Sequence, residues 1–152
     1  MIFASWQNLL VASSRSPEAP GTFELLERHA THMSLRHPSG FGYLVIVQHE
    51  DRPPPGYVET MGRITREFGV MLRAGGAVFE AKGFAAATQR SVGTALIHAV
   101  GKAKQIKLFS SVDEAAPWLA KQLGETCPGA RDAGALLAAL EAVRARPAPL
   151  AG

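Results

Sequence analysis

Apolar residues recur along the chain with two different spacings, one typical of strands and the other typical of helices. Short apolar runs predict strands at residues 2–6, 9–12, 41–47, 77–81 and 105–110. Three- and four-residue spacing predicts helices at residues 23–35, 58–72, 84–100, 112–123 and 133–144. Repeated alternation of strand and helix is typical of an α/β fold with a mostly parallel sheet. We therefore expect a mixed, mostly parallel sheet of about five strands flanked by four helices, plus a C-terminal helix.

The strand pattern also predicts where individual strands lie. The run 41–47 (FGYLVIV) is almost continuously apolar, which predicts a central strand covered on both faces. Gln7 and Asn8 separate the first two strands, and Asn8 tolerates the left-handed backbone of a tight turn. This opening hairpin makes the sheet mixed. Gly75 and Gly76 are predicted to break the chain between the second helix and the strand at 77–81.

The third predicted helix has a stripe of residues that we expect to be buried, while Gln89, Arg90 and His98 fall outside that stripe. The stripe comprises Phe84, Thr88, Val92, Leu96, Ala99 and Val100.

Capping residues mark the starts of the last two helices. Ser111 and Glu114 have the spacing of a capping box, and Asp132 can cap the final helix. Pro117 lies later than the first helical position, where proline is harmless, and this predicts a kink or a later helix start.

Size and composition restrict the class of protein. A chain of 152 residues suits one compact domain, and 47% hydrophobic residues exclude an intrinsically disordered chain. No charge-free apolar run approaches the roughly 18–20 residues that cross a membrane, so no membrane insertion is expected. Residues 1–12 lack the features of a secretory signal, and the single cysteine, Cys127, allows no intrachain disulfide. We expect a cytoplasmic protein.

The positive charge does not predict a nucleic-acid partner. Sixteen Lys and Arg residues against thirteen Asp and Glu give a formal net charge of +3. Lys102, Lys104 and Lys107 cluster after the third helix, but aromatic residues are only 7% of the chain and mostly occupy predicted core positions. Nucleic-acid modules usually interleave exposed aromatics with such charge. We interpret the cluster as a solvated helix end and strand rim.

The element order, over roughly residues 2–123, resembles the STAS domain of anti-sigma-factor antagonists and the related SpoIIAA-like proteins. The segments that carry the resemblance are FGYLVIV, AVFEAKGF with its following helix, and IKLFSSVDEAAPWLAKQL. The resemblance implies a small non-catalytic module that docks a protein partner or, occasionally, a small ligand. It divides the chain into a STAS-like domain, 1–124, and a C-terminal helical extension with a frayed tail, 125–152.

One segment departs from that family. Antagonists of the classical type carry an Asp-Ser pair after the central strand, and a kinase phosphorylates the serine. Here the same place holds residues 49–52 (HEDR) and three prolines, with no Ser or Thr before Thr60. The leading hypothesis is a regulatory interaction module whose partner binds at the ends of the second and third helices. The predicted contact residues are Asp51, Arg52, Tyr57, Lys82, Arg90 and Ser110.

The strand ends suggest an alternative function. In open α/β sheets, ligands bind in the crevice beyond the carboxyl ends of the strands. Those ends supply His49, Glu50 and Lys82, together with Asp51, Glu80, Ser110 and Ser111. A histidine flanked by carboxylates could act as a general base, and a lysine before a helix could hold an anion. The alternative is a small enzyme or ligand-binding protein; solvated strand ends are the plainer interpretation.

The remaining candidates carry less chemistry. His29 and His32 share a helix face, but a zinc site needs three or four ligands. Cys127 has no catalytic signature around it, and neither Gly75–Gly76 nor Lys82–Gly83 has the further glycines of a phosphate or dinucleotide loop. We predict no cofactor and no metal. A further alternative is a structural subunit, or a homodimer, that assembles through the C-terminal helix.

Overall fold

A computed structural model describes residues 1–101 and 105–147 of the chain. The elements, in chain order, are β1 (Ile2–Trp6), β2 (Leu9–Ser14), α1 (Thr22–Arg36), β3 (Phe41–Val47), α2 (Tyr57–Glu67), β4 (Leu72–Phe79), α3 (Gly83–Val100), β5 (Ile106–Phe109), α4 (Val112–Leu123), the 3₁₀ turn η1 (Pro128–Ala130) and α5 (Ala133–Ala145). Within the described residues the strands form one sheet in the order β1-β2-β3-β4-β5. The predicted mixed, mostly parallel α/β fold is confirmed.

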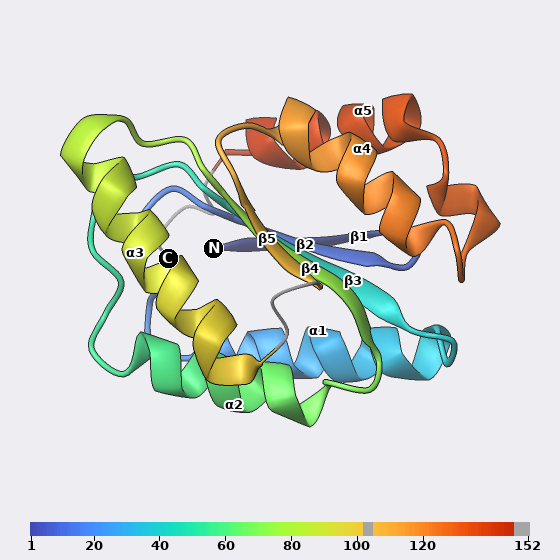
Figure 1. Cartoon of the computed structure of the whole chain (residues 1–152), viewed down its shortest axis with the longest axis horizontal. Helices are drawn as coiled ribbons and strands as arrows, with labels where there is room; N and C mark the ends of the chain where they lie inside the picture. Colours follow the sequence, from blue (N-terminus) through green and yellow to red (C-terminus); the bar gives the residue numbers. More distant parts are fainter. Residues whose placement is uncertain (102–104, 148–152) are drawn as a thin grey trace.

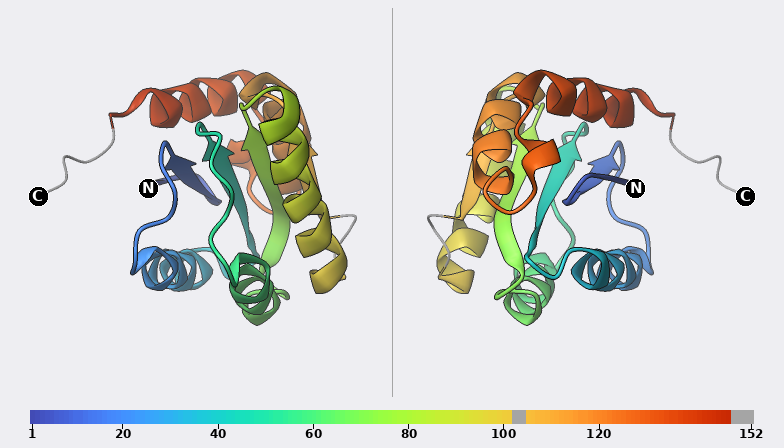
Figure 2. Two further views of the ribbon diagram at one scale, coloured as in Figure 1. Left: turned by 90° about the vertical axis from the view of Figure 1, so that its left-hand side faces the viewer. Right: turned by 90° about the vertical axis from the view of Figure 1, so that its right-hand side faces the viewer.

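The sheet is parallel from β2 to β5, and β1 pairs antiparallel with β2. β3 lies at its centre, as the apolar run FGYLVIV predicts, and six of its seven residues are buried. Figure 1 shows α1 and α2 on one side of the sheet and α4 and α5 on the other. The left view in Figure 2 shows α3 running beside β4, with its C-terminal end next to α2. Both faces of the central strands are therefore covered, which explains their apolar character.

The face under α4 and α5 holds the largest apolar cluster. Leu44 and Ile46 of β3 pack there with Leu119 and Leu123 of α4, and Leu136, Leu140 and Val143 of α5 join the same cluster. The C-terminal helix is thus part of the main core. Its apolar stripe, which could have served assembly, contacts the chain's own sheet. Residues 148–149 of the predicted frayed tail lie outside the described residues.

The second helix ends earlier than its spacing predicts. α2 stops at Glu67, and Leu72, which fits the helical stripe, begins β4 instead. Gly75 and Gly76 lie inside β4, so the prediction that they break the chain is wrong. A Cβ atom on Gly76 would lie 2.9 Å from the backbone oxygen of Lys107. Glycine is needed there because β5 approaches so closely.

The hairpin turn is also corrected in detail. Gln7 has φ of 50° and is the left-handed residue, whereas Asn8 is buried. The Asn8 side-chain amide donates to the backbone oxygen of Gly40 at 3.2 Å and to Thr126 Oγ1 at 3.3 Å. Asn8 therefore links its own turn to two distant loops, which no local turn rule predicts.

The predicted helix starts are confirmed. Ser111 accepts from the Glu114 backbone at 3.2 Å, and Asp132 accepts from the Ala135 backbone at 3.0 Å. The Glu114 carboxylate reaches back to the backbone of Ser110 at 3.0 Å. α4 begins at Val112 and continues through the exposed Pro117, so of the two effects predicted for this proline, a kink or a later start, the later start is wrong.

Candidate functional site

A cavity of about 70 Å³ lies between the sheet and α3, runs along β4 from Leu72 to Phe79, and reaches the carboxyl end of β3 at His49. Val45, Val47 and Phe79 form its floor, and Leu96 of α3 and Met61 of α2 form its walls. His49 and Gln89 are among its polar lining residues. The end of the cavity at His49 lies where the topology of an α/β sheet predicts a ligand.

The alternation of side chains along β3 explains how His49 reaches the cavity. Val45, Val47 and His49 point to the same face, because successive residues of an extended chain point to opposite faces. Gln48 points to the other face, where its side chain contacts Ser13 and Glu80. The strand ends therefore divide their polar residues between two faces, and the single crevice predicted from sequence does not form.

α3 covers this face with an unexpected pattern of burial. Its buried residues are Gln89 and Gly93, whereas Phe84 is 79% exposed. The predicted stripe is wrong in including Phe84 and in excluding Gln89, whereas its members Val92 and Leu96 do face the cavity. Gly93 lies against Leu108 and Phe79, where a Cβ atom would be 3.0 Å from Leu108 Cδ2. The close approach at Gly93 turns the side of the helix that carries Gln89 inward.

Gln89 is held in a defined orientation although it is only 2% exposed. Its Nε2 donates to the backbone oxygen of His49 at 2.8 Å and to that of Asp51 at 3.2 Å. Since both bonds require the NH₂ group, the amide cannot be flipped, and the other end of the amide is the Oε1 oxygen. That oxygen is buried and accepts no hydrogen bond from the described residues.

His49 is the second buried polar group with unused hydrogen-bonding capacity. Its side chain is 8% exposed, and neither ring nitrogen makes a hydrogen bond within the described residues. Nδ1 lies 3.4 Å from Asp51 Oδ2, close enough for an electrostatic contact but without hydrogen-bond geometry. A carboxylate beside Nδ1 favours the proton on that nitrogen and leaves Nε2 as an acceptor. This arrangement can bind a hydrogen-bond donor or act as a general base.

Both tyrosines of the chain, Tyr43 and Tyr57, line the cavity. Burial raises the pKa of Tyr57, and the nearby Glu18 carboxylate raises it further. Burial likewise raises the pKa of Tyr43, with further contributions from Tyr57 and Glu18. Both phenols therefore stay neutral at physiological pH, and their rings add π surface to the wall.

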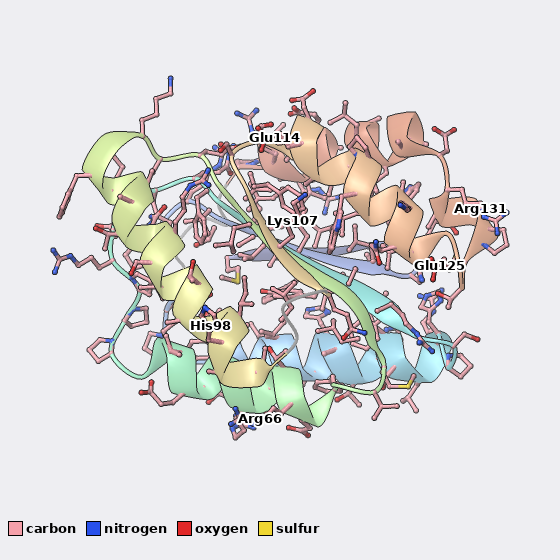
Figure 3. The ribbon with its side chains drawn as sticks, viewed as in Figure 1. Arg66, His98, Lys107, Glu114, Glu125 and Arg131 are labelled. Carbon is pink, nitrogen blue, oxygen red and sulfur yellow. The ribbon has the colours of Figure 1, made fainter. Side chains whose placement is uncertain are left out.

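The charged groups at the cavity are acidic. Glu18 and Asp51 are lining residues, and none of the described lining residues is a lysine or an arginine. Figure 3 labels Arg66 on α2 and His98 on α3, and both residues are exposed. The Arg66 guanidinium contacts the backbone oxygen of Ala99 at 3.5 Å, outside the cavity.

The predicted site residues separate in space. Of the trio His49, Glu50 and Lys82, only His49 lines the cavity, and Glu50 and Lys82 are exposed. Lys82 is the N-cap of α3 and makes no side-chain capping bond.

Of the predicted partner-contact residues, Asp51 and Tyr57 line the cavity, with the Asp51 side chain at its mouth 59% exposed, whereas Arg52 is exposed and does not line it. The Arg90 guanidinium donates to the Ser110 hydroxyl, so these two predicted contact residues pair with each other.

On the other face of the sheet, the polar residues at the strand ends pair with one another. Arg144 of α5 forms an ion pair with Glu80 and a second one with Glu141 at 3.3 Å. Arg15 donates to the backbone oxygen of Arg144 at 2.8 Å and to Gln48 Oε1 at 3.2 Å. These groups satisfy one another and hold α5 to the sheet.

The predicted metal and thiol candidates do not converge. His29 and His32 are exposed, and the His29 ring stacks on Phe3 with centroids 4.8 Å apart. No group of three or more His, Cys, Asp and Glu residues in the described chain is placed to hold a metal ion. Cys127 is partly buried, with Sγ 3.8 Å from Gln7 Oε1. Lys102 and Lys104 of the basic cluster lie outside the described residues.

Gln89 is the site residue that the sequence pattern missed. Its available signal is Gly93, four residues later on the same face of the helix. Glycine inside a helix often marks a close approach to another element, and that face then points inward.

No protein-family model, curated protein or solved structure matches the chain. The resemblance to the STAS and SpoIIAA-like proteins stays a prediction. Across residues 1–101 and 105–147, the helices lack the combination of length and apolar character that a bilayer crossing requires.

Proposed function

We propose that this protein is a small-molecule-binding domain whose ligand occupies the cavity between α3 and the sheet. The observation that supports the proposal is the pairing of an apolar cavity with buried polar atoms that lack partners. His49 and Gln89 supply those atoms, and their neighbours in the cavity are mainly aliphatic and aromatic. This combination is characteristic of ligand sites, in which apolar walls provide contact and a few polar groups fix orientation.

The energetics favour an occupant. A buried polar group left without any hydrogen bond costs about 1–3 kcal/mol, so the atoms of His49 and Gln89 that bond to no described residue favour an occupant of the cavity, water or a ligand, that bonds to them. A ligand that bonds to both groups removes this cost and also covers the apolar walls. The residues stay in place without the ligand because Gln89 is fixed by two backbone oxygens.

The lining favours binding over covalent catalysis. None of the described lining residues is a serine or a cysteine. The Thr65 hydroxyl is directed to the backbone oxygen of Met61 at 2.7 Å and is not free to act as a nucleophile.

The proposal is tested by titrating ¹⁵N-labelled protein with a panel of four-carbon to six-carbon amines, alcohols and carboxylates. We expect saturable shifts in the amides of β3, β4 and α3. Gly75 lines the cavity, so Gly75→Val should fill it and weaken binding. Ala95 lies on the exposed side of α3, so Ala95→Ser should leave binding unchanged. If no compound shifts these amides, or if Gly75→Val binds as wild type does, the proposal is wrong.

A second candidate is the interaction module that the STAS resemblance implies. The observation in its favour is Phe84, which is 79% exposed at the start of α3, the helix that also walls the cavity. Aromatic side chains are enriched at protein interfaces, and an exposed phenylalanine can anchor a partner. The test compares Phe84→Ser with Leu35→Ser, an equally exposed residue on α1, in pull-downs from the native lysate. Equal retention of the same proteins by both variants would contradict a role for Phe84.

A further inference from the structure

We propose that the ligand is a compact apolar amine, bound as its cation, with the nitrogen at His49 and Gln89 and the hydrocarbon part under α3. This inference rests on the proposed function and adds the chemical class of the ligand. Hydrogen-bonding direction, charge and cavity size each support it.

Gln89 determines the direction of one hydrogen bond. Its NH₂ group is already used by the backbone oxygens of His49 and Asp51, at 2.8 and 3.2 Å. What it offers to the cavity is therefore Oε1, which is only an acceptor. A carboxylate ligand has no donor for this atom, whereas an ammonium group has three.

His49 supports the same direction. The Asp51 carboxylate lies 3.4 Å from Nδ1, which favours the proton on Nδ1 and leaves Nε2 as an acceptor. The buried Nε2 makes no hydrogen bond within the described residues. Two acceptors, Nε2 of His49 and Oε1 of Gln89, thus belong to side chains that line one cavity.

The charges around the cavity favour a cation. The charged lining residues are Glu18 and Asp51, and no lysine or arginine belongs to the described lining. Tyr43 and Tyr57 add the π faces that attract cations in partly dehydrated sites. An anion would meet two carboxylates and two acceptors with no opposing positive charge.

The volume limits the hydrocarbon part. A cavity of about 150 Å³ accommodates benzene, and this one measures about 70 Å³. It therefore suits a short or branched chain of about four carbons. The apolar walls formed by Val45, Val47 and Leu108 match such a chain.

The test uses three probes of nearly equal size at pH 7: n-butylamine, n-butanol and butanoate. Dissociation constants are measured by NMR titration of the full chain at constant ionic strength. We expect butylamine to bind at least tenfold more tightly than butanoate and more tightly than butanol.

A matched pair of variants then locates the charge effect. Asp51→Asn removes a lining carboxylate, and Glu50→Gln removes the adjacent one, which is exposed and outside the cavity. We expect Asp51→Asn to weaken butylamine at least threefold more than it weakens butanol, because the alcohol loses only the effect of Asp51 on His49, while Glu50→Gln changes neither.

The outcomes separate the two proposals. If butanol or butanoate binds as tightly as butylamine, the cavity is a ligand site but the amine inference is overturned. If Asp51→Asn and Glu50→Gln weaken butylamine equally, general charge attraction accounts for the preference and the inference is again overturned. If none of the three probes binds, both this inference and the proposed function are overturned.

Discussion

Gly75 and Gly76 are neighbours in β4, but their hydrogens point to opposite faces of the sheet, and this allows a paired test of the fold. A Cβ atom on Gly75 would lie 3.4 Å from Ile106 Cγ1 and 3.6 Å from Leu72 Cδ2, which are ordinary contacts. A Cβ atom on Gly76 would lie 2.9 Å from the Lys107 backbone oxygen and 3.1 Å from Phe109 Cε2. Alanine should therefore be accepted at Gly75 and resisted at Gly76.

The magnitudes follow from these contacts. Gly75→Ala buries a methyl group, which contributes about 0.8 kcal/mol, and it reduces the entropy of the unfolded chain by the equivalent of about 0.4–1 kcal/mol. Gly76→Ala gains the same entropy term but overpacks the core, which costs about 1–3 kcal/mol. The contact is with backbone, which cannot rotate away. We expect the free energies of unfolding to differ by about 2–4 kcal/mol between the variants.

Urea unfolding followed by circular dichroism measures this difference. With a slope of about 2 kcal/mol per molar urea, the two midpoints should be separated by about 1–2 M, with Gly75→Ala the higher. The wild-type protein is the reference for both variants. A Gly76→Ala protein at least as stable as Gly75→Ala would refute the close approach of β5 to β4 on the face under α4.

Two further predictions concern the cavity and the C-terminal helix. Because Tyr43 and Tyr57 both have a raised pKa, absorbance at 295 nm should not rise near pH 10, the ordinary value for tyrosine. Their contribution to stability is present below pH 10 and is lost as the pH rises further, so ionisation should coincide with loss of far-ultraviolet dichroism. A rise near pH 10 with intact dichroism would contradict the burial of both phenols. Leu140→Ala should lower the free energy of unfolding by about 2–5 kcal/mol in a urea titration, because Leu140 is fully buried against the sheet. A loss below about 1 kcal/mol would mean that α5 is a dispensable appendage.

The sequence pattern predicted the elements whose local signals agree with their packing. The apolar run of β3 gave its central position, and Ser111 and Asp132 gave the starts of α4 and α5. These signals depend on the chain itself: side-chain hydrophobicity and a cap within one turn.

The errors fall where distant segments decide the local structure. Leu72 fits the helical spacing of α2 but pairs with Phe41 across the sheet. Gly76 resembles a breaker, yet it is a strand residue because β5 lies against it. Gln89 was assigned to the exposed side of α3 because glutamine is polar, although its partners are backbone oxygens in another connection. The spacing of apolar residues within one helix carries no information about a hydrogen-bond partner that lies 40 residues away in the sequence.

The candidate site was predicted in part. Sheet topology predicted the carboxyl ends of the strands, and His49 does lie there beside a cavity. The pattern could not decide which polar residues share a face, because that depends on the phase of the pleat after Val47. Gln48 and His49 are neighbours in the chain, so their side chains point to opposite faces of the sheet.

The unequal packing of the two faces has a consequence for how this protein could change over evolution. The face under α4 and α5 holds the large aliphatic cluster and the Arg144 network, so it can supply a reserve of stability. α3 buries only Gln89 and Gly93 and contributes little to that reserve. If the cavity binds a ligand as proposed, substitutions at Val92 and Leu96, which line it from α3, would alter ligand preference at modest cost to folding, whereas Gly93 has no room for a side chain. Descendants of one scaffold could diverge in specificity through this single helix while the rest of the molecule stays the same.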